Sequence, residues 1–166
     1  MELSTMFNAG IAPTDNKELE EAIQYIVIRL GQEQYGIDIR NIDNIVRMQS
    51  ITRVPKMPAF LKGVINLRGE VIPVISMRLK MDLPEDEITK KTRIIVIKLE
   101  QEGNVGFIVD EVKEVVTLSG SEIEKITYNT KDEKQSLINA VGKHNGELIS
   151  LFDLNAITLE DNSVKE

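Results

Sequence analysis

Residues 53–78 read Arg-Val-Pro-Lys-Met-Pro-Ala-Phe-Leu-Lys-Gly-Val-Ile-Asn-Leu-Arg-Gly-Glu-Val-Ile-Pro-Val-Ile-Ser-Met-Arg. Two runs rich in β-branched residues, 63–67 and 71–75, flank Arg68 and Gly69. Runs of this kind on either side of a turn that contains glycine predict a β-hairpin. The turn would hold the Arg68 side chain out into solvent, where a positioned arginine is more often a docking element than a core element.

The chain around this block repeats itself. The matching pairs of segments are 26–30 with 95–99, 36–46 with 106–116, and 69–72 with 146–149. Glycines and flanking charges match as well as apolar residues, so the pattern predicts one β module used twice. Short apolar runs separated by turn residues are typical of small β barrels. We therefore predict an all-β fold of two five-stranded barrels, about residues 30–90 and about residues 91–150, with the terminal segments crossing between them.

The first predicted strand of each half is apolar on both faces. These strands are residues 25–30 and 93–99. A strand whose outer face meets water should alternate apolar and polar side chains. Both outer faces must therefore be covered, and we expect each barrel to cover the other, with a partly apolar groove where they meet.

Composition narrows the classes of partner. The 166 residues are 42% hydrophobic and 4% aromatic, with a formal net charge of −7. This charge disfavours nucleic acid and anionic membrane surfaces, which are bound through clustered lysine and arginine. The sequence has no apolar stretch of about 20 residues and no secretory signal at its start, so we expect a cytoplasmic protein without membrane insertion.

Catalytic and metal-ligating residues are poorly represented. The sequence has no cysteine and a single histidine, His144, in a polar turn where it reads as a solvated residue. There is no glycine-rich phosphate loop and no acidic loop with calcium spacing. A ligand-binding or hydrolytic barrel would need convergent polar groups in the groove, where the sequence supplies Ile, Val and Gly. We predict that no metal or cofactor co-purifies with the chain.

Two blocks of the sequence carry a resemblance to a known family. Residues 58–75, quoted above, and residues 106–115, Gly-Phe-Ile-Val-Asp-Glu-Val-Lys-Glu-Val, resemble the signatures of the CheW family, and the similarity extends over residues 23–159. The resemblance implies two five-stranded SH3-like barrels around a shared hydrophobic centre and no enzyme activity. It also implies an adaptor at receptor clusters, with two partners: the regulatory domain of the histidine kinase CheA and the cytoplasmic tip of methyl-accepting chemoreceptors.

The resemblance also implies which residues face each partner. It places the kinase-binding surface at Ile42, Asp43 and Asn44. It places the receptor-binding surface at Ile94, Gly106, Val112 and Val115. The signature and docking residues are Gly63, Asn66, Arg68 and Gly69. From strand periodicity we further expect Ile42 to face away from Ile39 and Ile45, as a partly exposed anchor for the kinase.

Three positions depart from the family pattern. Asn44 stands where relatives often have glutamate, which removes an ion pair to Arg68. Ser76 replaces a usual aspartate, and Ala140 a common glycine. By this comparison residues 22–160 form the CheW-like domain, between flexible tails at 1–21 and 161–166. The same fold occurs as a module of larger signalling proteins, CheV or CheA itself, and that alternative stays open.

Overall fold

The computed structural model describes residues 22–126 and 137–159, in which β-strands are the main regular structure and the helices are short. The expected tails at 1–21 and 161–166 lie outside the described residues. The strands are β1 (Ile23–Leu30), β2 (Glu33–Asp38), β3 (Ile42–Arg47), β4 (Leu61–Leu67), β5 (Glu70–Ser76), β6 (Arg93–Leu99), β7 (Gly103–Val109), β8 (Glu111–Leu118), β9 (Ile123–Lys125), β10 (Ile138–His144) and β11 (Glu147–Phe152). The short helices are η1 (Ile39–Asn41), α3 (Met77–Lys80), η2 (Gly120–Glu122) and η3 (Leu154–Ala156).

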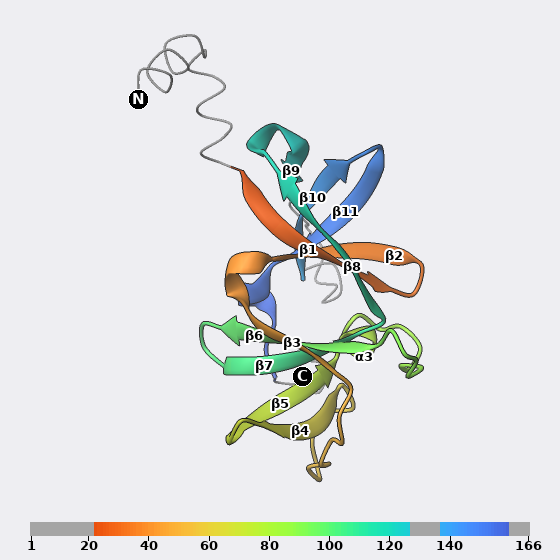
Figure 1. Ribbon diagram of the computed structural model, residues 1–166, viewed down its shortest axis with the longest axis vertical. Helices are drawn as coiled ribbons and strands as arrows, with labels where there is room; N and C mark the ends of the chain where they lie inside the picture. The colour runs from red at the N-terminus through yellow and green to blue at the C-terminus, as the bar shows by residue number, and fades with distance from the viewer. Residues whose placement is uncertain (1–21, 127–136, 160–166) are drawn as a thin grey trace, which may run out of the picture.

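The strands form two sheets, which make the two lobes of the molecule (Figure 1). The six-stranded sheet has the order β8-β1-β2-β11-β10-β9, and the five-stranded sheet has the order β3-β6-β7-β5-β4. The predicted all-β class is confirmed. The sheets have six and five strands instead of five each, because the three-residue strand β9 pairs with β10.

The internal repeat is confirmed by the strand pairing. The antiparallel pair β1–β8 corresponds to β6–β3, and the parallel pair β2–β11 corresponds to β7–β5. The first two strands of each repeat therefore leave their own half and complete the sheet of the other half. The expected division near residue 90 is wrong for this reason, since β6 and β7 belong with β3, β4 and β5.

Three apolar cores follow from this exchange. One lies within each sheet, and the largest lies between the sheets. On β1, Val27 faces the core of the six-stranded sheet, whereas Ile28 faces the central core. On β6, Val96 and Ile97 divide in the same way between the five-stranded sheet and the centre. The prediction that each first strand is covered on both faces is confirmed, and all four side chains are fully buried.

Candidate functional site

The predicted hairpin is formed by β4 and β5, whose last paired residues are Leu67 and Glu70. Arg68 and Gly69 make the turn with positive φ angles of 55° and 84°, as in a type I′ hairpin turn. The Asn66 side chain braces it, because Oδ1 accepts a hydrogen bond from the Gly69 N–H at 3.1 Å. Arg68 is exposed, and no residue in the described ranges forms an ion pair with it. The hairpin therefore presents an exposed guanidinium at its tip.

Gly63, the first glycine of the signature, is buried and has a different role. Thr52, in the segment before β4, pairs with Val64 on β4. The two residues exchange two backbone hydrogen bonds of 2.9 Å. A Cβ atom on Gly63 would lie 2.2 Å from the Thr52 carbonyl oxygen, and its φ is +142°. The expected docking role of Gly63 is therefore wrong as a direct contact, because this position lets two backbones approach.

The segment expected to face the kinase is not simply extended. Helix η1 precedes Ile42, and the pairing of β3 with β6 shifts register between Ile42 and Asn44. Ile39, Ile42 and Ile45 consequently all pack, partly buried, against the central core. The expectation that Ile42 faces away from the other two is wrong, because the bulge at Asp43 resets the alternation.

The neighbours of Ile42 are more accessible. The Asp43 side chain is 41% exposed and lies 4.0 Å from the Lys98 ammonium group. Asn44 turns its Oδ1 back to accept a hydrogen bond from the Ile45 N–H at 2.8 Å. Neither side chain pairs with Arg68. Within this segment Asp43 is therefore the residue best placed to meet a partner without supporting the core.

Ile42→Asp is expected to lower the free energy of unfolding by about 2 kcal/mol, because it removes apolar contacts and places a carboxylate beside the core. Asp43→Ala is the matched control and should cost less than about 1 kcal/mol, since it breaks only an exposed ion pair. Urea denaturation of both variants checks this. Equal stability of Ile42→Asp and the parent chain would show that Ile42 is a surface anchor.

Two of the residues expected to face the receptor are inside the protein. Ile94 is 0% exposed and belongs to the core of the five-stranded sheet. A Cβ on Gly106 would lie 2.8 Å from Ile94 Cγ2 and 3.4 Å from Val74 Cγ2. The expectation of a surface role is wrong for Ile94 and Gly106. Both are buried, and the missing side chain of Gly106 leaves room for the side chain of Ile94. Gly36 does the same for Leu151 in the other sheet, where the distance is 2.7 Å.

The other two expected receptor residues lie on β8, at the edge of the six-stranded sheet. Val112 packs partly buried against the central core, and Val115 is 48% exposed. The expected kinase residues lie on β3, at the edge of the five-stranded sheet. Because β3 and β8 are equivalent strands of the repeat, the two expected surfaces occupy equivalent edges of the two sheets.

A cluster of charged residues that sequence reasoning missed joins the sheets beside these edges. Asp110, between β7 and β8, accepts two hydrogen bonds from the Arg78 guanidinium, at 2.8 and 2.6 Å. It also accepts one from the Gly31 N–H at 2.9 Å and lies 3.5 Å from Arg29. Arg29 in turn pairs with Glu111 at 3.0 Å. The only sequence signals were that Asp110 belongs to the block 106–115 and that Arg78 ends the quoted stretch 53–78.

This arrangement keeps Asp110 ionised. Burial opposes its charge, but the hydrogen bonds from Arg78 and Gly31 and the positive charges of Arg78 and Arg29 together lower its pKa below the ordinary value of 3.8. The carboxylate thus ties the β1–β2 turn of one sheet to the α3 helix of the other.

The departure at Ser76 has a structural explanation. Ser76 is fully buried at the end of β5, and its Oγ accepts a hydrogen bond from the Leu79 N–H at 3.1 Å. It is therefore the N-cap of α3. Serine and aspartate are both favoured caps, so the replacement preserves the start of the helix that carries Arg78.

Within residues 22–126 and 137–159, no group of three or more His, Asp or Glu side chains is arranged to hold a metal ion. His144 lies at the end of β10, next to the Asn145–Gly146 turn. In the same ranges, no helix has the length and apolar character required to cross a bilayer.

Comparison with known proteins agrees with this architecture. The family model for the CheW-like domain matches residues 24–161. The chemotaxis protein CheW of Bacillus subtilis is 36% identical, over 88% of this chain and 93% of the relative. The CheW of Helicobacter pylori is 34% identical, over 93% and 90%. The crystal structure of the scaffolding protein TtCheW from Thermoanaerobacter tengcongensis superposes with a TM-score of 0.73 at 30% identity, covering 79% of this chain and 88% of that one. The chain belongs to the CheW family.

Proposed function

We propose that this chain is a non-enzymatic adaptor of the cytoplasm that couples chemoreceptors to the histidine kinase CheA by binding both. The observation that carries the proposal is the pair of equivalent sheet edges, β3 and β8, each next to the central core. Exposed edges can pair with another chain, so a duplicated module offers two related docking surfaces. Relatives named as chemotaxis proteins, and one as a scaffolding protein, support the same role.

We assign the regulatory domain of CheA to the edge formed by β3. Its accessible contact residue is Asp43, with Ile42 behind it as a supporting side chain. We assign the cytoplasmic tip of the chemoreceptor to the edge formed by β8, where Val115 offers an apolar contact and Val112 supports it from the core side. An exposed valine beside charged Lys113 and Glu114 has the mixed character of a protein interface.

Purified protein should bind the isolated regulatory domain of CheA and a receptor-tip fragment in separate titrations. Asp43→Lys should weaken binding of the kinase domain, and Val115→Asp should weaken binding of the receptor fragment. Neither residue supports the core, so both variants should unfold at nearly the parent temperature. Loss of both interactions in either variant would contradict the assignment of one edge to each partner.

Arg68→Ala is expected to leave the fold intact, because its side chain is exposed and forms no ion pair with any residue that the structure describes, but to reduce assembly of the receptor–adaptor–kinase complex. Arg68→Lys should restore assembly only in part, since lysine lacks the planar donor fork of arginine. Co-sedimentation of kinase with receptor-containing membranes, together with receptor-stimulated kinase activity, measures both effects. Full kinase stimulation with the alanine variant would show that the residue at the hairpin tip serves only the turn.

A further inference from the structure

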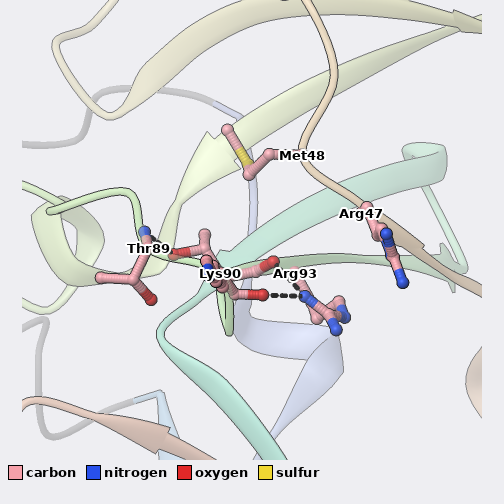
Figure 2. A pocket seen from close by; sticks show the side chains of 6 residues that line it. Arg47, Met48, Thr89, Lys90 and Arg93 are labelled. Atoms are coloured by element: carbon pink, nitrogen blue, oxygen red, sulfur yellow. Dashed lines mark hydrogen bonds between the residues drawn. The ribbon is translucent and has the colours of Figure 1, made fainter.

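A basic depression lies where β3 ends and β6 begins. None of the residues expected to bind the kinase or the receptor lines it. Its volume is about 480 Å³, and Arg47, Met48, Thr89, Lys90, Thr92 and Arg93 line it. Three of these six residues are cations and none is an acid. In the view of Figure 2, Arg93 lies between Lys90 and Arg47, and Met48 lies across from them.

The two arginines occupy an electrostatically unfavourable position. Arg47 on β3 and Arg93 on β6 are direct partners in the antiparallel register. Like charges opposite each other across strands destabilise a sheet. In the described part of the chain no acid forms an ion pair with Arg47, Lys90 or Arg93. The charge of this depression is therefore uncompensated within that part of the protein.

Hydrogen bonds within the surrounding loop hold the Arg93 side chain in place. The Thr89 N–H donates to Thr92 Oγ1 at 2.8 Å, and the Thr92 N–H donates back to the Thr89 carbonyl at 3.2 Å. Arg93 Nη1 donates to the carbonyls of Lys90 and Thr92, each at 2.8 Å (Figure 2). These bonds orient the guanidinium and leave its other N–H donors for a ligand. An oriented arginine loses less entropy on binding an anion.

We propose that this depression binds carboxylate side chains of an acidic protein segment. A carboxylate accepts paired hydrogen bonds from a guanidinium, and the thioether of Met48 can contact an apolar neighbour of the acid. A long polyanion fits less well, because the chain carries a net charge of −7 and would repel it over a larger surface. The occupant is an acidic segment of a partner protein, and this inference does not depend on the two partners proposed above.

Amide NMR of the ¹⁵N-labelled full chain tests the proposal. The probe is a blocked pentapeptide of alternating glutamate and leucine, and the control peptide has glutamine for glutamate. The glutamate peptide should shift the amides of Arg47, Lys90 and Arg93, and added salt should weaken the effect. The double variant Arg47→Gln/Arg93→Gln should weaken binding about tenfold or more, as expected for lost charge-assisted hydrogen bonds.

The matched control is Lys125→Gln/Lys143→Gln, which removes two exposed cations from β9 and β10 of the other sheet. It should bind the glutamate peptide like the parent chain. Thermal unfolding checks that the arginine double variant is folded, since it removes the cross-strand repulsion and also the two hydrogen bonds from Arg93 Nη1. Equal binding of the glutamine peptide, equal loss in the lysine control, or tighter binding of inorganic phosphate than of the glutamate peptide would each overturn the proposal.

Discussion

Replacing Asp110 by alanine is expected to lower the free energy of unfolding by about 3 kcal/mol, the usual cost of removing one partner of a buried ion pair. The Asp110 side chain is only 9% exposed, and Arg78 is 17% exposed. Without the carboxylate, the Arg78 guanidinium loses two short hydrogen bonds, and the Gly31 N–H loses its acceptor. Because these groups belong to different sheets, the loss weakens the join between the two lobes as well as a local contact.

Glu111→Ala is the control for this prediction. Glu111 pairs with Arg29 in the same cluster, but the side chains are 24% and 37% exposed. Its removal should therefore cost less than about 1 kcal/mol. Urea denaturation at neutral pH compares the two variants. Equal losses would mean that Asp110 contributes no more than an ordinary surface charge.

The contribution of Asp110 should also depend on pH. Since its pKa is lower in the folded chain than the ordinary 3.8 of a free aspartate, its stabilisation is fully present above that value. This stabilisation is lost as the pH falls below 3.8 and passes through the lower pKa that Asp110 has in the folded chain. The stability difference between the parent chain and Asp110→Asn should be constant from about pH 5 to pH 7 and shrink below about pH 4. A difference that grows on acidification would contradict the assigned charge state.

Gly63→Ala is expected to destabilise the chain by about 3 kcal/mol, through backbone strain and a steric clash acting together. A residue with a side chain rarely adopts the φ of +142° found at Gly63. The added methyl group would also lie 2.2 Å from a backbone oxygen of Thr52, which cannot rotate away. The segment that includes Thr52 must therefore separate from β4, or the hairpin must shift.

Gly69→Ala is the control that separates the backbone strain at Gly63 from the steric clash with Thr52. Gly69 also has a positive φ, +84°, but an added Cβ would meet no atom within 4 Å. Its substitution should cost only about 1 kcal/mol, the strain of the left-handed conformation. Thermal unfolding of both variants gives the comparison. Similar losses at the two positions would show that the approach of Thr52 is not what requires Gly63.

Much of the fold was predictable because it rests on local patterns. Arg68 and Gly69 between two β-branched runs predicted the hairpin, and the repeated segments predicted two related modules. The apolar character of residues 25–30 on both faces predicted a shared core. The exchange of strands between the modules was not predictable in this way, because a repeat shows which segments are alike and not which of them pair.

The candidate surfaces were predicted less well, for physical reasons that differ by residue. The alternation rule failed at Ile42, because a bulge at Asp43 resets the register. The resemblance placed Gly106 and Ile94 on the receptor surface, but in the folded chain the two residues pack against each other. Asp110 and Arg78 are far apart in the chain, so only the folded structure brings their charges together.

The most direct test of the account is a three-component binding measurement with purified chain, the regulatory domain of CheA and a receptor-tip fragment. Sedimentation velocity should show a complex of the chain with each partner alone and a heavier complex when both are present. Saturation with one partner should leave a binding site for the other, because β3 and β8 are separate edges. Displacement of the kinase domain by the receptor fragment, or failure of either to bind, would contradict the two-surface adaptor.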